Sequence, residues 1–249
     1  MAVHLYGVTT AAASTPERLT GRADAPVRLV DDGELAVIVS DIDPERVAGP
    51  KDLLAHARAL EAYVERETVI PMQFGIALPD DESVRERVLD QERESLAYLV
   101  SAFEGLVQVT VQAFHHEEPA LREVLRREPG LVEEREWLRS HPGAANQPRQ
   151  VALGQAVAEV LEELEEEDRT WILDRLAPLA QAVAEGEVAG GHQLLNAAFL
   201  VERNGLDGFG KQVAACAEEV EERVRLRYVG PQPPYSFLEP VRNGELVWD

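Results

Sequence analysis

Short apolar runs separated by polar turns predict strands at the start of the chain. Residues 2–8 are rich in Val, Leu and Tyr. Residues 27–41 contain two such runs on either side of Asp32-Gly33, a dipeptide that is typical of hairpin turns. The first forty residues therefore predict one strand followed by a β-hairpin.

Apolar residues at helical spacing follow this hairpin. In residues 50–67 they lie opposite a polar face and are Leu53, Leu54, Ala57, Leu60 and Val64. Residues 68–78 predict extended chain, in which Pro71 indicates an edge or a bulge, because proline donates no hydrogen bond to a ladder. Residues 80–105 predict a second helix, with Gly105 as the residue that ends it.

A strand and a long helical region come next. Residues 106–114 alternate strictly between apolar and polar side chains, which predicts a half-exposed strand. Two short helices follow, broken at Pro129-Gly130, and residues 149–186 predict a long helix that Pro178 kinks or breaks. The middle of the chain is therefore predicted to be helical throughout.

The last part of the chain returns to extended structure. Residues 192–202 form an apolar run of strand length. Residues 207–224 predict a helix, and Cys216 belongs to its apolar stripe, which favours a buried thiol. Residues 225–230 predict the last strand before a Pro-rich tail.

This order of elements predicts an α+β fold with two α+β domains. We expect an N-terminal domain over residues 1–104 and a C-terminal domain over residues 105–249. The second domain follows the order strand, helices, strand, helix, strand. That order resembles a ferredoxin-like sandwich with an enlarged helical crossover and a Pro-rich tail.

The charge of the chain narrows the classes of partner. The 46 acidic and 24 basic residues give a formal net charge of −22. A surface this acidic repels phosphate backbones and anionic headgroups, so we expect neither nucleic acid nor a lipid membrane as a partner. The single cysteine excludes an intrachain disulfide and favours a reducing compartment, and the first ten residues lack the basic region of a secretory signal.

One stretch imitates a nucleotide-binding motif. Residues 205–211, GLDGFGK, match the phosphate-loop pattern as far as its lysine. The next residue is Gln212, where the pattern requires a Ser or Thr hydroxyl for magnesium. We keep a nucleotide-binding enzyme as the alternative function, although a glycine-rich turn into an ordinary helix is the favoured interpretation.

Other candidate chemistry is weaker. The only histidine cluster is His115-His116, followed by two glutamates, and its spacing favours a surface loop over a metal site. The glutamate run at residues 162–168 has apolar residues beside it, so a solvated helix face is favoured over binding of cations or of a basic partner. We therefore predict no catalytic residue, no bound metal and no cofactor.

Several segments together resemble the gas vesicle protein F/L family of accessory proteins. They are TVIPMQFGIALPDDESVR (68–85), HQLLNAAFLVER (192–203) and YVGPQPPYSF (228–237), with VHLYGV (3–8) as a fitting first strand. The motif positions that the resemblance singles out as interaction candidates are Pro71, Phe74, Gly75, Leu195, Asn196, Phe199, Gly230, Pro231, Pro233, Pro234, Tyr235 and Phe237.

The resemblance implies a non-enzymatic role in the cytoplasm, in building gas vesicles. It implies a minor vesicle component or assembly factor. Its partners would be the small, very apolar gas vesicle shell protein and other gas vesicle accessory proteins. An exposed sheet edge on an acidic, soluble protein is compatible with contact by strand addition.

The Pro-rich stretch raises a question of its own. Pro231, Pro233 and Pro234 donate no hydrogen bonds, so we expect them to end the last strand. Tyr235 and Phe237 are then expected to pack back onto the second domain, both largely buried. Self-packing is favoured over a groove that binds a partner, and the second interpretation stays open.

Overall fold

A computed structural model describes residues 2–238 of the 249-residue chain. Contacts divide these residues into two compact units. The first comprises residues 2–109, 199–206 and 229–238, and the second comprises residues 110–198 and 207–228. The chain therefore passes between the units several times, and the domain boundary after residue 104 stays a prediction.

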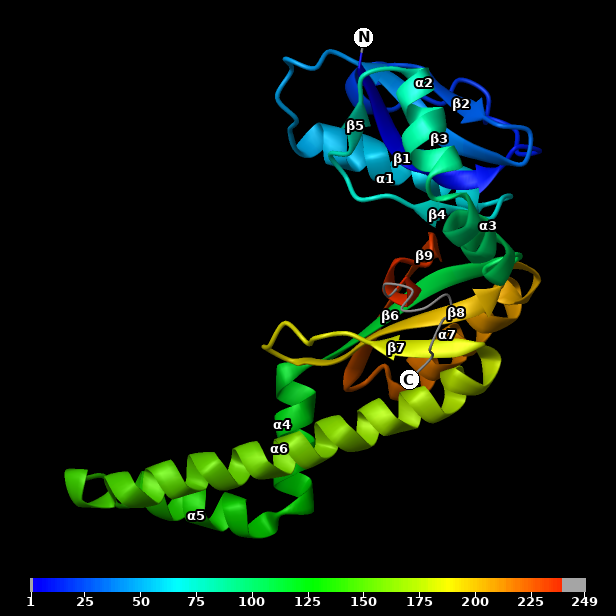
Figure 1. The fold of residues 1–249 in the computed structure, drawn as a ribbon. Helices are drawn as coiled ribbons and strands as arrows, with labels where there is room; N and C mark the ends of the chain where they lie inside the picture. Colours follow the sequence, from blue (N-terminus) through cyan, green and yellow to red (C-terminus); the bar gives the residue numbers. More distant parts are fainter. Residues whose placement is uncertain (1, 239–249) are drawn as a thin grey trace. The chain divides into compact units, whose positions relative to one another are not determined.

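The first unit is built on an antiparallel sheet in the order β2-β3-β1-β4, and β5 also pairs with β1 (Figure 1). Its strands are β1 (Ala2–Thr10), β2 (Val27–Asp31), β3 (Leu35–Ile42), β4 (Ile70–Pro71) and β5 (Ala77–Leu78). The predicted hairpin is confirmed, since the Asp32 carboxylate accepts hydrogen bonds from the backbone of Glu34 and Leu35. Pro71 lies at the predicted sheet edge, in a two-residue strand.

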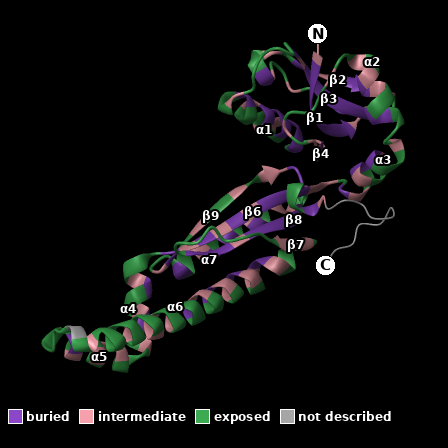
Figure 2. Cartoon of the chain, turned by 60° about the vertical axis from the view of Figure 1, so that its left-hand side comes forward, coloured by how far each residue is buried: buried purple, intermediate pink, exposed green. Residues whose placement is uncertain are grey.

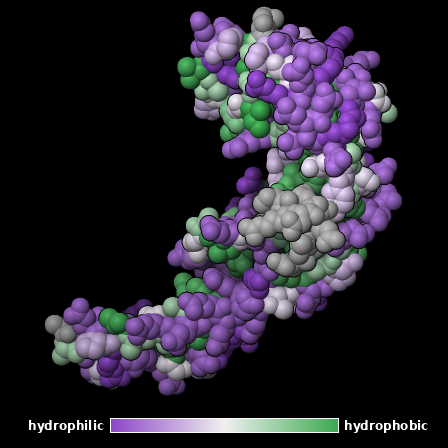
Figure 3. Space-filling model, in the orientation of Figure 1, coloured by the Kyte–Doolittle hydropathy of each residue, from purple (hydrophilic) through white to green (hydrophobic). Residues whose placement is uncertain are grey.

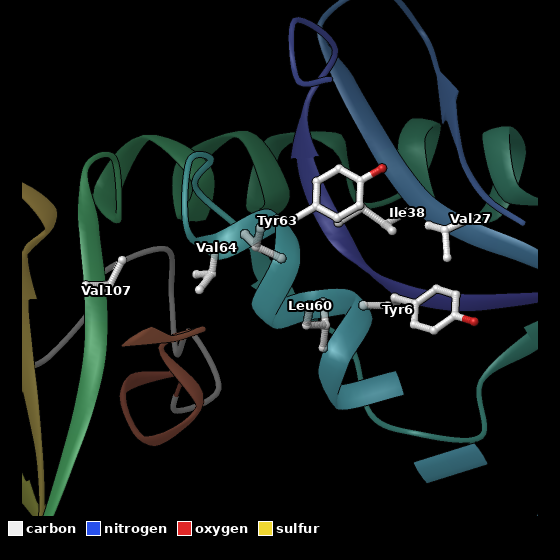
Figure 4. Close-up of a cluster of buried hydrophobic side chains, with 9 residues drawn as sticks. Tyr6, Val27, Ile38, Leu60, Tyr63, Val64 and Val107 are labelled. Carbon is white, nitrogen blue, oxygen red and sulfur yellow. The ribbon is translucent and has the colours of Figure 1, made fainter. Parts of the chain in front are cut away.

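Helix α1 (Pro50–Val64) covers this sheet and supplies much of its core. Figure 4 shows Leu60 and Tyr63 of α1 in one cluster with Tyr6 and Ile38 of the strands, all of them fully buried. Asp52 starts the helix by accepting a hydrogen bond from the Gly49 N–H at 2.9 Å. Only part of the predicted apolar stripe is buried, because Leu53 and Leu54 are 53% and 56% exposed.

The second predicted helix, over residues 80–105, is divided into three pieces. These are α2 (Asp81–Val84), a π-helical segment (Arg85–Asp90) and α3 (Arg93–Ala102). The Asp80 carboxylate caps the start by accepting the Ser83 N–H at 2.8 Å. Gly105 follows α3 with a φ of +71°, the left-handed conformation that ends helices without strain in glycine.

The second sheet has the order β7-β8-β6-β9 and lies mostly in the second unit. Its strands, all antiparallel to their neighbours, are β6 (Leu106–His115), β7 (Ala182–Glu185), β8 (Gln193–Glu202) and β9 (Val224–Gln232). Figure 2 shows that buried residues concentrate in β6 and β8. The predicted alternation of β6 is largely confirmed: the side chains of residues 107, 109, 111 and 113 are buried and those of 110, 112 and 114 are half-buried, with the buried Gln108 as the exception.

Four helices accompany this sheet: α4 (Glu117–Arg127), α5 (Pro129–Ser140), α6 (Gln147–Leu176) and α7 (Leu206–Val220). The predicted break at Pro129 is confirmed, since it is the first residue of α5. The predicted break of the long helix at Pro178 is confirmed, but the prediction that helix resumes up to residue 186 is wrong. Helix α6 ends at Leu176, just before Pro178, and residues 182–185 are strand β7, whose pairing with β8 overrides their helical propensity.

The α+β class is thus confirmed, with a mixture of helices and two antiparallel sheets. The elements from β6 to β9 follow the succession strand, helices, two strands, helix and strand. This is the succession of the predicted ferredoxin-like sandwich, and that finer assignment stays a prediction. No helix within residues 2–238 is long and apolar enough to cross a membrane.

Two glycine substitutions should change stability in opposite directions. A Cβ at Gly7 would lie 2.6 Å from the Ile70 carbonyl oxygen, so Gly7→Ala should lower the free energy of unfolding by about 1–3 kcal/mol. A Cβ at Gly154, inside α6, would meet nothing within 4 Å, so Gly154→Ala should raise it by about 0.5–1 kcal/mol. Urea unfolding of both variants measures the difference, and a stabilised Gly7→Ala would contradict the packing of β1 on β4.

Candidate functional site

The first motif segment places an aromatic ring over a buried pair of histidines. Phe74 lies between β4 and β5, with its ring centroid 5.6 Å from that of His4 and 5.5 Å from that of His56. Gly75 has a φ of +100°, which makes the turn toward β5 possible without strain. Pro71 and Gly75 therefore shape the chain around Phe74.

The two histidines form a neutral hydrogen-bonded chain. His56 Nε2 donates to the Met72 carbonyl at 3.2 Å, so its Nδ1 accepts from His4 Nε2 at 3.0 Å. Burial, followed by the neighbouring His56, lowers the pKa of His4 to about 4. Burial also lowers the pKa of His56, so the pair is uncharged at neutral pH. Within the described residues, no group of three or more His, Cys, Asp or Glu could hold a metal ion.

The second motif segment lies in β8 and holds the turn that precedes it. Leu195 and Phe199 are buried. Asn196 donates through Nδ2 to the Glu187 carbonyl at 3.0 Å, and its own carbonyl accepts the Gly186 N–H at 2.8 Å. The asparagine thus fixes the connection between β7 and β8, a structural role in the second unit.

The third motif segment begins with a close backbone contact. Gly230 has a φ of +149°, and a Cβ there would lie 2.8 Å from Val109 Cγ1. Only glycine fits this position without strain or a clash. The prediction that the prolines end the strand is wrong for Pro231, because β9 continues through it to Gln232. Proline is tolerated there because β9 is an edge strand of the described sheet.

The rest of this segment packs against β6. Pro233 and Pro234 are buried, and the Ser236 N–H donates to the Gln108 side chain at 2.9 Å. Phe237 is 5% exposed, as predicted, whereas Tyr235 is 45% exposed, and the prediction that it is largely buried is wrong. One aromatic side chain is enough to anchor the segment, and the other lies at the surface.

A buried ion pair in the second unit was not anticipated from the sequence. Asp168 of α6 accepts hydrogen bonds from His115 Nε2 at 2.9 Å and from Arg223 Nε at 2.8 Å. Burial alone would raise the pKa of Asp168, but the hydrogen bonds from Arg223 and His115 outweigh it and lower that pKa. The three residues come from α6, the end of β6 and the turn before β9, and they join these elements.

The spacing of the histidines favoured a surface loop for His115, and this prediction is wrong. It is the last residue of β6 and is 4% exposed. The available signal was its place in the alternating pattern of residues 106–114, which assigns residue 115 to the buried side. Asp168 carried no such signal, because it closes a run of glutamates. Cys216, in contrast, is buried on α7 as predicted.

The phosphate-loop imitation is mostly helical. Gly205 lies in a short 3-10 turn, and α7 begins at Leu206, so Gly208, Gly210 and Lys211 are all helical residues. A phosphate loop needs a non-helical backbone that wraps around the phosphates before the helix starts. The nucleotide-binding alternative therefore gains no support from this arrangement.

Exposed apolar side chains gather at the start of α1. Leu53 lies seven residues before the buried Leu60, on the same side of the helix. Leu54, Val47 in the preceding loop and Ile76 before β5 are also exposed. We call Val47, Leu53, Leu54 and Ile76 the α1 apolar surface, and Figure 3 shows hydrophobic atoms at the surface over α1.

Comparison with known proteins supplies the family. The model of the family "Gas vesicle synthesis protein GvpL/GvpF" matches residues 2–239. The chain belongs to the GvpL/GvpF family. Gas vesicle protein F of Streptomyces sp. (strain CB03234) is 35% identical over 244 residues, which cover 96% of this chain and 100% of that protein.

Solved structures of gas vesicle proteins share the fold of this GvpL/GvpF family member. The crystal structure of GvpF from Anabaena sp. PCC7120 has a TM-score of 0.79 at 24% identity, covering 97% of this chain and 99% of that one. The crystal structure of GvpF from Microcystis aeruginosa has a TM-score of 0.74, also at 24% identity, covering 96% and 99%. The family resemblance inferred from the three motif segments is confirmed.

The two aromatic residues of the last motif segment should contribute unequally to stability. Phe237→Ala should lower the free energy of unfolding by about 3 kcal/mol, because it empties a buried site. Tyr235→Ala should lower it by less than about 1 kcal/mol, because the side chain is half-exposed. Thermal and urea unfolding of this GvpL/GvpF protein test the pair. Equal losses would mean that Tyr235 is also an anchor.

The Asp168 ion pair should make stability depend on pH. The pKa of Asp168 is lowered in the folded state, so its contribution is present above the unfolded value of about 3.9 and is lost as pH falls through the folded value. Asp168→Asn should lower the free energy of unfolding at pH 7 by about 3 kcal/mol and should weaken its acid dependence. Urea unfolding at neutral and acid pH measures both effects, with exposed Glu163→Gln as the control.

Proposed function

We propose that the protein is a non-enzymatic accessory protein of gas vesicles, acting in the cytoplasm as an assembly factor or minor structural component. It contacts the small, very apolar shell protein and other gas vesicle accessory proteins. It uses no metal and no cofactor. Membership of the GvpL/GvpF family supplies the gas vesicle setting for this proposal.

The observation that carries the proposed contact is the α1 apolar surface. Leu53 and Leu54 are exposed to solvent at the start of α1, whereas the rest of its apolar stripe is largely buried. Val47 and Ile76 are exposed in two loops outside the helix. Exposed large apolar side chains of this kind are typical of a surface that another protein covers. An apolar shell protein is a chemically matched partner for it.

The rest of the first unit is suited to presenting this surface rigidly. Asp52, directly before Leu53, is buried and bound by Arg46 at 2.8 Å and by the Gly49 N–H at 2.9 Å. The start of α1 is therefore fixed to its own loop before any partner arrives. A pre-organised surface loses less conformational entropy on binding.

The high negative charge of the chain supports the same role. Net charge far from zero keeps a protein soluble and monomeric. A complex between an acidic accessory protein and an apolar subunit would inherit part of that solubility. The proposed activity is therefore to hold the shell protein in a dispersed form during assembly.

Co-expression and pull-down with the shell protein from the same gene cluster test the proposal. The wild-type protein should retain the shell protein. Leu53→Ser combined with Leu54→Ser should reduce retention about tenfold or more, because both exposed anchors are lost. Val151→Ser is the matched control, since Val151 is 55% exposed on α6 and lies outside the α1 apolar surface.

The outcomes separate the parts of the proposal. Unchanged retention by the double variant would move the contact away from α1. If the shell protein is never retained while other gas vesicle accessory proteins are, the protein is a scaffold between accessory proteins. Circular dichroism and thermal unfolding of each variant establish that the fold is unchanged.

A further inference from the structure

The second unit contains an acidic groove that the proposed function does not use. The groove has a volume of about 660 Å³ and is lined by residues of α6, of the segment that connects β7 to β8, and of β8. Carboxylates approach it from two different elements. Glu162, Glu165 and Glu166 come from α6, while Glu185 and Glu187 come from the end of β7 and the residues after it.

The basic residue that lines the groove neutralises only part of this charge. Arg169 binds Glu166 at 2.8 Å and Glu185 at 2.6 Å. Within the described residues, no ion pair involves Glu162 or Glu187. Like charges that face one another across a groove disfavour the folded state, unless a cation is added between them.

A buried polar atom points to the same wall of the groove. His115 Nε2 donates a hydrogen bond to Asp168, and its Nδ1 is buried without a hydrogen-bond partner in the described part of the chain. That nitrogen lies 3.9 Å from Glu165 Oε1. The buried imidazole therefore lies behind the Glu165 carboxylate, so the groove wall is polar beneath its surface as well as at it.

The floor of the groove is apolar, which distinguishes it from a solvated helix face. Val188, Leu194 and Leu195 line it beneath the carboxylates. Leu194 and Leu195 are buried, and Val188 is 50% exposed. A ligand that fits must therefore carry positive charges flanking apolar side chains.

We propose that this groove binds a basic, amphipathic peptide segment of a partner protein, in which Arg or Lys residues alternate with apolar ones. The positive side chains pair with Glu162, Glu165 and Glu187, and the apolar ones contact Val188 and Leu194. The groove is separate in sequence and chemistry from the α1 apolar surface. It selects its partner by charge, which raises the association rate and rejects acidic copies of the same chain.

The test uses the full-length protein and a fluorescently labelled hexapeptide of alternating Arg and Leu with blocked ends. Fluorescence anisotropy at low ionic strength should show saturable binding that weakens at high ionic strength. The matched peptide with Gln in place of Arg should not bind measurably. The peptide with Ser in place of Leu should bind more weakly than the original.

Two triple variants locate the binding. Glu162→Gln, Glu165→Gln and Glu187→Gln together should weaken the peptide affinity about tenfold. Glu159→Gln, Glu218→Gln and Glu221→Gln remove the same charge from exposed positions in α6, in α7 and directly after α7. This control variant should weaken the peptide affinity less than about twofold. Equal losses in the two variants would overturn the proposal, because binding would then follow net charge alone.

Two further measurements keep the proposal falsifiable. Val188→Ser should weaken binding while Val151→Ser, at a similarly exposed position, should not; equal behaviour would exclude the apolar floor as a contact. Saturable Ca²⁺ binding that the groove variant abolishes, without peptide binding, would make the site a cation site instead. Because no gas vesicle protein enters this assay, its failure leaves the shell-protein contact untouched.

Discussion

The second unit depends on one buried interaction, in which the Asp168 carboxylate accepts hydrogen bonds from His115 and Arg223. Helix α6 buries few side chains for its length, and only Leu164, Asp168, Ile172 and Leu176 are buried on it. Three elements that are far apart in the sequence converge on the one charged member of that set. Removing a buried charge from water costs free energy, so the arrangement is stable only while His115 and Arg223 stay in place. These hydrogen bonds are directional, so they fix the position of α6 more closely than apolar contacts do.

Elements with strong local patterns were predictable, and elements that depend on distant contacts were not. The hairpin at Asp32-Gly33 and the break at Pro129 follow from turn and helix-start chemistry that acts within a few residues. Strand β7 does not, because Ala182 to Glu185 are good helix formers that become extended only by pairing with β8. Polar contacts such as His115 with Asp168, 53 residues apart, are set by tertiary structure and have no periodic signature.

The contacts of the motif positions show structural roles for several of them, and their part in binding a partner stays a prediction. Asn196 and Gly230 are fixed by local geometry, one by hydrogen bonds and the other by a close backbone approach. The exposed residues that favour partner contact, Leu53 and Leu54, were assigned to the apolar stripe of a helix, because helical spacing does not distinguish a side that packs on the sheet from a side that is left uncovered.

Strand β9 has a consequence for how such a protein behaves near a β-rich, sticky subunit. It is an edge strand of the described sheet, and open edges can template the growth of further strands from other molecules. Pro231 removes one ladder donor from this edge, and the exposed side chains of Arg225 and Arg227 add positive charge along it. Repeated addition of strands needs a continuous row of backbone hydrogen-bond donors and acceptors without charged side chains beside it, and β9 does not offer such a row. Pro231 and the charged side chains of β9 therefore make this edge a poor template for the addition of further strands.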